Sequence, residues 1–358
     1  MQMIFFVQNL RGFASLIVVL FHLQIWLSDT DSHISVSRFL FGNGAFGVDL
    51  FFIISGFIIC HATERNENNM TAKYIIRRLF RIYPVYFVAL TFVYLAYSYQ
   101  EPIENYLNAL LIMQRDYSLR SPFFGYNMLY PAWTLSFEIL FYTIFLVSMI
   151  ISHTYRSLLC SLFIVFSFFV LQLSLSGRVS LNAELTPAYS GDFAIPLIRM
   201  LSTPMLVEFV VGVVFFHVYK WMLNNRADFY KYIAVACIVS SLVLYLFYHT
   251  DNHGLSQRGL IATLMFLGFL IIEANGVKLK SKVLSFFGDI SYSLYLSHVI
   301  TIKIIVDLLD SLSMIEFKSG PLYMLFVLAI CILVAYISHK LIEVPFIKVG
   351  KNLVSKLH

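Results

Sequence analysis

Two ionisable residues stand near opposite ends of the first long apolar stretch, LRGFASLIVVLFH. Arg11 lies close to its start and His22 at its end. A helix rises about 1.5 Å per residue, so these side chains would lie about 16 Å apart. A neutral histidine can take a proton from a reacting hydroxyl, and a guanidinium can grip a phosphate through two hydrogen bonds. The pair therefore suggests an anion site and a general base at two levels of one helix.

The composition indicates that this helix belongs to a membrane protein. Of the 358 residues, 59% are hydrophobic and only 13% are charged, and the mean hydropathy is +0.79. Apolar blocks about 20 residues long recur along the chain, the length that crosses a bilayer as a helix. We expect an all-α polytopic fold with about ten transmembrane helices. The predicted spans are 10–28, 45–62, 83–99, 133–151, 158–175, 204–220, 232–249, 258–274, 288–306 and 322–341.

Basic residues predict the orientation of these spans, because cytoplasmic segments of membrane proteins are enriched in Lys and Arg. Most of the 25 Lys and Arg residues fall on inner segments when the N-terminus is placed inside. Both termini are therefore expected in the cytoplasm, and the net charge of +5 needs no nucleic-acid partner. The stretch 103–114 is too short and polar to cross and predicts an interfacial or re-entrant helix. We expect one membrane domain over 1–350, a short basic cytoplasmic tail over 351–358, and no soluble domain.

Depth places further ionisable residues near the level of His22. The fourth predicted span enters from the outer face, so Glu138 should lie at the same depth as His22, about 8–9 Å below the outer edge. His298 is expected near mid-membrane, and Asp49 and Glu208 within two turns of the outer edge. A carboxylate beside a histidine fixes its tautomer and stabilises the imidazolium, which favours general base catalysis. Taken alone, His22 is equally well explained by a hydrogen bond between helices.

A basic cluster lies on the inner side in KYIIRRLFRIYPVY. Arg78 and Arg81 are three residues apart and share a helix face, with Arg77 adjacent. Such clusters commonly set orientation or bind lipid headgroups. They also suit a phosphate site. A phosphorylated donor with a long arm, such as coenzyme A, would dock here and reach His22 with its acyl end.

In their order along the chain, these segments resemble the membrane acyltransferase 3 family, the ten-span O-acyltransferases of bacterial surface polysaccharides and related glycoconjugates. The matching segments are the Arg-x10-His of Arg11 and His22, GVDLFFIISGF (47–57), the Arg-x-x-Arg of Arg78 and Arg81, WTLSFEILFY (133–142), SYSLYLSH (291–298) and IEVPF (342–346). The resemblance covers essentially the whole chain. Thr134 departs from the pattern, since members often have serine there.

The resemblance implies an acyl-CoA donor, usually acetyl-CoA, with Arg11 and His22 essential and with Ser136 and Glu138 in the site. The expected catalytic residues are His22, Glu138 and Arg11; the expected coenzyme-binding residues are Arg77, Arg78, Arg81 and Arg11; and the expected lining residues are Asp49, Ser55, Trp133, Ser136, Tyr142, Tyr292 and His298. The expected acceptor is a sugar hydroxyl of an O-antigen, capsule or exopolysaccharide, or of its lipid-linked precursor. The expected location is the bacterial inner membrane, in contact with membrane lipid.

Competing interpretations have less support. HTDNH (249–253) offers two histidines but only one acid in an outer loop, so we expect no metal site. GNGAFG (42–47) fits a dinucleotide-binding pattern but precedes a membrane span and has no βαβ context. A transporter or flippase would also keep intramembrane acids and histidines. Inverted repeats and spans broken at mid-membrane are typical of transporters and are not evident here. Acyl transfer to an acceptor other than a carbohydrate stays open.

Overall fold

The computed structural model describes residues 4–27, 31–187, 195–278, 280–313 and 319–357. Regular structure in these residues is helical throughout, which confirms the predicted all-α class. The helices are α1 (Phe5–Leu23), α2 (Asp31–Phe41), α3 (Phe46–Ala62), α4 (Met70–Tyr97), α5 (Ile103–Leu110), α6 (Trp133–Ile151), α7 (Arg156–Ser176), α8 (Ile195–Leu201), α9 (Met205–Asn224), α10 (Tyr230–Phe247), α11 (Arg258–Ala274), α12 (Lys282–Ser311), α13 (Gly320–Ser338) and α14 (Val344–Ser355). Short turns of helix are η1 (Gln24–Leu27), η2 (Tyr130–Ala132), η3 (Ala183–Leu185) and η5 (His339–Glu343).

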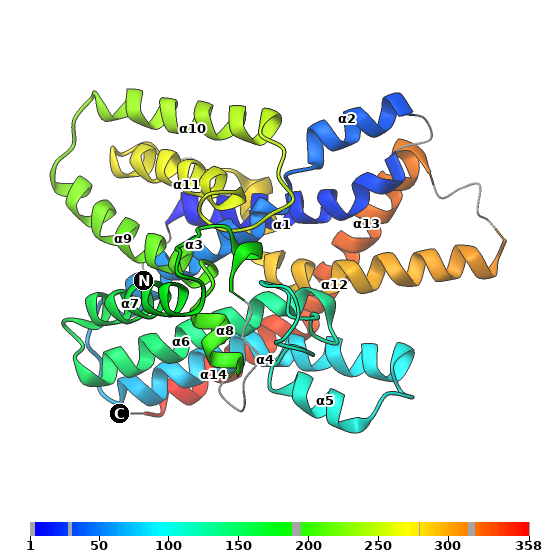
Figure 1. The fold of residues 1–358 in the computed structure, drawn as a ribbon, viewed down its shortest axis with the longest axis horizontal. Helices are drawn as coiled ribbons and strands as arrows, with labels where there is room; N and C mark the ends of the chain where they lie inside the picture. Colours follow the sequence, from blue (N-terminus) through cyan, green and yellow to red (C-terminus); the bar gives the residue numbers. More distant parts are fainter. Residues whose placement is uncertain (1–3, 28–30, 188–194, 279, 314–318, 358) are drawn as a thin grey trace.

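The chain is a multi-pass membrane protein. Nine helical stretches in the described residues are long and apolar enough to cross a membrane. Each of the ten predicted spans coincides with a helix. The predicted span that is not among those nine stretches is α11, which has 17 residues and packs against α10 and α3. α1 begins and α14 ends at the same end of the bundle, as the distribution of basic residues predicts (Figure 1). The short helix predicted near 103–114 is confirmed as α5.

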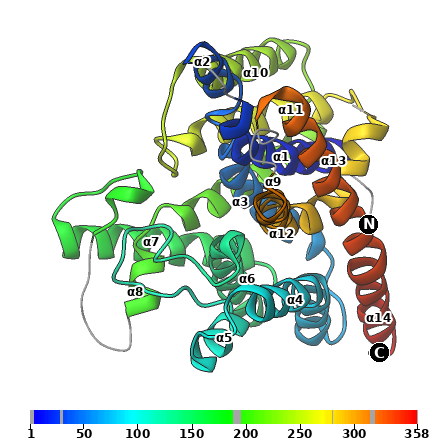
Figure 2. The same cartoon turned by 90° about the vertical axis from the view of Figure 1, so that its right-hand side faces the viewer.

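α1 packs against α3, α11, α12 and α13 (Figure 2). Its first turn has unpaired backbone N–H groups, as every helix does. The carboxylate of Glu273, on α11, accepts hydrogen bonds from the backbone nitrogens of Phe5 at 3.1 Å and Phe6 at 2.6 Å. A negative charge is favourable at this positive end of a helix dipole. The start of α1 is thus anchored to a neighbouring helix.

α1 and α12 touch through two glycines. A Cβ atom on Gly12 would lie 2.3 Å from the carbonyl oxygen of Leu284, and one on Gly288 would lie 2.3 Å from that of Gln8. Neither position has room for a side chain, so the two backbones are in direct contact. Small residues allow this close approach between membrane helices.

α4 and α14 meet at the end of the bundle where α1 begins. α4 continues through Pro84, so Arg78 and Arg81 belong to the same helix as the third predicted span. α14 packs against α4 so closely that a Cβ on Gly350 would lie 2.7 Å from the Cβ of Phe80. Most of the predicted tail is therefore helical, since α14 continues to Ser355.

We expect Gly288→Ala to lower the free energy of unfolding of the purified protein by about 1–3 kcal/mol, because the added methyl group forces α1 and α12 apart. The thermal unfolding midpoint should fall accordingly. The measurement is the thermal unfolding midpoint in detergent. It is monitored as the loss of the monodisperse peak in size-exclusion chromatography after heating. Val283→Ala is the control, since Val283 lies on the same helix and is 65% exposed. Equal midpoints for the two variants would contradict the tight contact.

Candidate functional site

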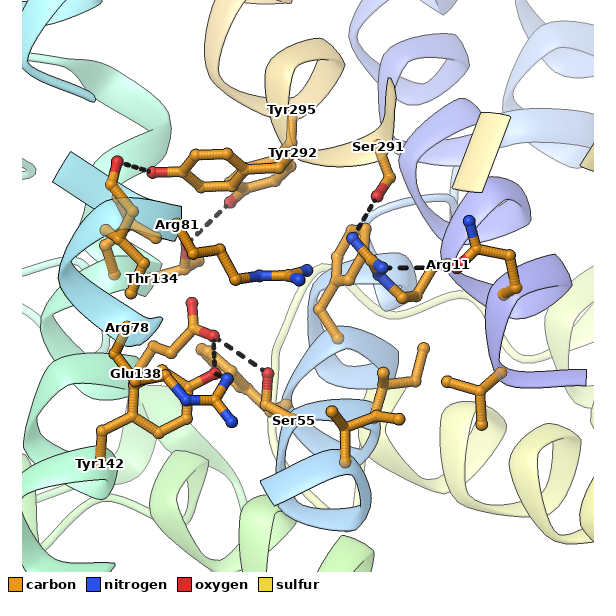
Figure 3. A pocket seen from close by; sticks show the side chains of 18 of the residues that line it. Arg11, Ser55, Arg78, Arg81, Thr134, Glu138, Tyr142, Ser291, Tyr292 and Tyr295 are labelled. Atoms are coloured by element: carbon orange, nitrogen blue, oxygen red, sulfur yellow. Dashed lines mark hydrogen bonds between the residues drawn. The ribbon is translucent and has the colours of Figure 1, made fainter. Parts of the chain in front are cut away.

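A cavity of about 540 Å³ lies between α1, α3, α4, α6 and α12 at the end where α1 begins (Figure 3). Four basic side chains line it and face a single carboxylate, that of Glu138. The basic residues are Arg11, Arg78, Arg81 and Lys351. A cavity with low-dielectric walls and an excess of one charge concentrates ligands of the opposite charge. We call this the donor-side cavity.

Glu138 is held in a small network that also fixes Arg78. Its carboxylate accepts hydrogen bonds from Ser55 Oγ at 3.2 Å and from the Tyr142 hydroxyl. Arg78 Nη1 donates to the Tyr142 hydroxyl at 3.3 Å, and its guanidinium carbon lies 4.5 Å from the centre of that ring. Glu138 therefore compensates the charge of Arg78 through Tyr142.

Arg81 forms no hydrogen bond or ion pair with another residue in the described part of the chain, and the carboxylate of Glu343 acts on it only through longer-range electrostatic attraction. It extends from α4 into the open part of the cavity, towards Arg11 (Figure 3). Arg11 Nη2 donates to Ser291 Oγ, a neutral group on α12, at 2.9 Å. Two guanidinium groups without a carboxylate partner thus face one space. This arrangement suits a phosphate, which accepts paired hydrogen bonds from arginine.

For two basic residues, the position in the structure differs from the position that the sequence predicted. Arg77 lies outside the donor-side cavity, where it forms an ion pair with Glu67 at 2.8 Å and is 45% exposed. Lys351 lines the cavity although the sequence placed it in a tail. Only the packing of α14 on α4 brings Lys351 to this position, and no motif in the sequence signals it.

A second cavity, of about 170 Å³, lies towards the opposite end of the bundle. Three histidines, six aromatic residues and one arginine line it, namely His22, His253, His298, Phe21, Phe123, Tyr126, Tyr130, Trp133, Tyr295 and Arg258. The side chain of Asp251 also lines it and is 84% exposed, so the cavity reaches the surface. We call it the acceptor-side cavity. Val48 and Tyr295 line both cavities, which therefore adjoin at these two residues.

The hydrogen bonds of His22 determine which ring nitrogen can act as a base. Its Nδ1 lies 2.9 Å from the carbonyl oxygen of Val18. Because a carbonyl only accepts, Nδ1 carries the hydrogen and Nε2 is left unprotonated. By the same argument Nδ1 of His298 donates to the carbonyl of Tyr295 at 2.7 Å. The unprotonated Nε2 of His298 then lies 3.4 Å from Nδ1 of His22.

The structure does not bring Glu138 to His22. They line different cavities, and His22 is oriented by a backbone carbonyl and a histidine instead of a carboxylate. Equal depth fixes the level of a side chain in the membrane but leaves open which face of its helix it occupies. Glu138 faces Ser55 on α3, whereas His22 faces His298 on α12.

The other predicted residues divide between the two cavities and the protein interior. Ser55, Tyr142 and Tyr292 line the donor-side cavity, and Trp133 and His298 line the acceptor-side cavity. Ser136 lines neither, since its hydroxyl donates to the carbonyl of Ile112 at 2.6 Å and holds the segment after α5. Asp49 and Glu208 are fully buried and line neither cavity.

Sequence reasoning missed His253, which it considered only as a metal ligand. The structure buries its side chain against Asp49, with Nδ1 at 2.8 Å from Oδ2. Glu184 accepts a hydrogen bond from the backbone nitrogen of His253 at 3.0 Å. Burial raises the pKa of the Glu184 carboxyl, an effect that the nearby histidine opposes. Asp49 lies in a predicted span and His253 in a predicted loop, and nothing in the sequence indicates that their side chains form a hydrogen bond.

Comparison with known proteins gives a family and two relatives. The family described as "Acyltransferase domain" matches residues 4–340. "Exopolysaccharide production protein ExoZ" of Rhizobium meliloti (strain 1021) is 30% identical over 276 residues, which are 73% of this chain and 78% of the relative. "Putative acetyltransferase ORF330" of Acidianus two-tailed virus is 27% identical over 297 residues, 82% of each chain. No solved structure gives a significant match.

We expect pyrophosphate to raise the unfolding midpoint of the purified protein by binding in the donor-side cavity. Arg81→Gln should weaken this binding by about tenfold or more, because it removes a charged hydrogen-bond donor worth about 1.5–3 kcal/mol. The measurement is the midpoint as a function of pyrophosphate concentration. Arg226→Gln, on the exposed turn between α9 and α10, is the control. Identical titrations for the Arg81 variant and the wild type would show that the anion binds elsewhere.

Proposed function

The chain belongs to the acyltransferase family whose domain it matches, and from that premise we propose that it transfers an acetyl group from cytoplasmic acetyl-CoA to a sugar hydroxyl. We place this reaction in the bacterial cytoplasmic (inner) membrane. One observation carries the proposal: α1 presents Arg11 to a cationic cavity at one level and His22 to an aromatic cavity at another. A donor with charged phosphates at one end and a thioester at the other spans that separation.

In this proposal the phosphates of the donor bind in the donor-side cavity. Arg81 and Arg11 supply guanidinium groups without carboxylate partners, and Lys351 adds a third positive charge. Arg78 is already compensated by the Glu138–Tyr142 network, so we assign it to shaping the cavity wall. The flexible arm would extend about 16 Å along α1, past Val48 and Tyr295, to bring the thioester to His22.

The proposed chemistry follows from the tautomer of His22. The acceptor hydroxyl enters from the acceptor-side cavity and attacks the thioester carbonyl while Nε2 of His22 removes its proton. The C–S bond then breaks, the coenzyme leaves as a thiolate, and the ester remains on the sugar. The proton on His22 passes to the thiolate. The imidazolium that exists in between donates from Nδ1 to Val18 O and to His298 Nε2, and both contacts stabilise its charge.

The lining of the acceptor-side cavity supports a carbohydrate acceptor. Aromatic faces pack against the C–H faces of sugars, and six aromatic residues line this space beside polar groups. The printed name of the rhizobial relative refers to exopolysaccharide production, which agrees with a surface glycan as the acceptor here. The viral relative is named as an acetyltransferase, which favours acetyl as the group transferred.

We expect His22→Gln to reduce acetylation of the acceptor by at least about 100-fold, the usual contribution of a general base. The measurement is mass spectrometry of surface glycans from cells that express the wild type, the variant or neither. Pyrophosphate should still stabilise the purified variant, because the donor-side cavity is intact. His217→Gln is the control, an exposed histidine on the transmembrane helix α9 that lines neither cavity.

A glycan that gains one acetyl group with both the wild type and His22→Gln would disprove the base assignment. A glycan population unchanged by the wild type would disprove the carbohydrate acceptor.

A further inference from the structure

His253 is held more firmly than a loop residue needs to be. Its backbone nitrogen donates to Glu184, its carbonyl accepts from the nitrogen of Ala183 at 2.9 Å, and its ring donates to Asp49 at 2.8 Å. The next backbone nitrogen, of Gly254, donates to the other oxygen of Asp49 at 3.1 Å. The backbone contacts alone would anchor this loop.

The side chain of His253 is fixed as precisely as its backbone. Its ring packs edge to face against Trp133, with centroids 5.5 Å apart, and against Phe123, with centroids 5.8 Å apart. Because Asp49 is an acceptor, Nδ1 of His253 carries the hydrogen and Nε2 is an unprotonated acceptor. Within the described residues, this Nε2 forms no hydrogen bond.

The free nitrogen belongs to a residue that lines the acceptor-side cavity together with His22. A fully buried carboxylate is costly to maintain, and here Asp49 holds one ring in one tautomer beside a cavity that reaches the surface. The arrangement leaves one acceptor atom for a ligand that enters this cavity.

We infer that Nε2 of His253 accepts a hydrogen bond from a second hydroxyl of the carbohydrate acceptor, while the reacting hydroxyl lies at His22. This inference rests on the proposed function and deepens it, since it makes His253 a specificity-determining residue for that site. Asp49 is a positioning residue that acts through His253. The acceptor is then a sugar unit with two free hydroxyls, and an analogue lacking the second hydroxyl loses the contact.

The test separates acceptor binding from the donor reaction. Purified protein is given acetyl-CoA with a panel of methyl glycosides, and two rates are measured: acetyl transfer to the glycoside, and hydrolysis of acetyl-CoA with water as the acceptor. With the glycoside that the wild type acetylates fastest, His253→Gln should raise KM for the glycoside by about tenfold, as expected for a lost hydrogen bond. Hydrolysis should stay within about twofold of the wild type, because His22 is unaffected.

Two further variants sharpen the result. Asp49→Asn should raise the same KM, because an amide can donate to Nδ1 and release the fixed tautomer of His253. His249→Gln is the matched control, since His249 lies in the same loop, is exposed and lines neither cavity. Its KM should equal that of the wild type.

The outcomes that would overturn the inference are distinct. An unchanged KM in His253→Gln, with hydrolysis retained, would show that His253 does not contact the acceptor. Loss of hydrolysis together with transfer would show that His253 acts on the donor or on the fold. Hydrolysis by the wild type without transfer to any glycoside would count against the proposed carbohydrate acceptor itself, and this inference would fall with it.

Discussion

The contact between α1 and α12 fixes both levels of the site. Two cross-links join these helices, Arg11 to Ser291 on the donor side and His22 to His298 on the acceptor side. The first lies at the contact made by Gly12 and Gly288, where the backbones touch, and the second lies farther along both helices. Because the two helices cannot separate or slide without breaking that contact, the spacing between the anion site and the base is set by the helix itself. The rest of the bundle encloses this pair: α4 and α14 bring cations to one end, and α3, η2 and α11 bring the acceptor-side lining to the other.

A membrane imposes the division into two cavities. Ionisable side chains are costly in hydrocarbon and are kept where protein or water-filled space surrounds them. Here three guanidinium groups, Lys351 and the carboxylate of Glu138 line the cavity at the end where α1 begins, while histidines and aromatic rings, with Arg258 and Asp251 among them, line the other cavity. Among the described residues, Val48 and Tyr295 line both. In the proposed reaction, a charged coenzyme would find its counter-charges on one side, and its acyl end would meet the acceptor beside His22 on the other.

Much of the fold followed from hydropathy, because apolar blocks of bilayer length determine helices almost by themselves. Among the motif residues, Arg11, Arg81 and Tyr292 line the donor-side cavity and His22 lines the acceptor-side cavity, and the roles expected of them stay predictions. Predictions failed where rotation or long-range packing decides. The depth of a residue in the membrane does not determine which helix face it occupies. It therefore could not predict that Glu138 bonds to Ser55 instead of His22, or that Ser136 bonds to Ile112. Lys351 and His253 belong to segments that reach the cavities only through the packing of α14 on α4 and of the 249–257 loop on Asp49 and Glu184.

The central claim is that one donor spans both cavities along α1. It is tested most directly by a cryo-electron microscopy structure of the protein bound to a ketone analogue of acetyl-CoA, in which the thioester is replaced by an unreactive ketone. We expect phosphates between Arg81, Arg11 and Lys351, an arm passing Val48 and Tyr295, and the ketone carbon within reach of a hydroxyl held by Nε2 of His22. An analogue whose acyl end stops beside Glu138 in the donor-side cavity, with Tyr295 closing the way to His22, would contradict it.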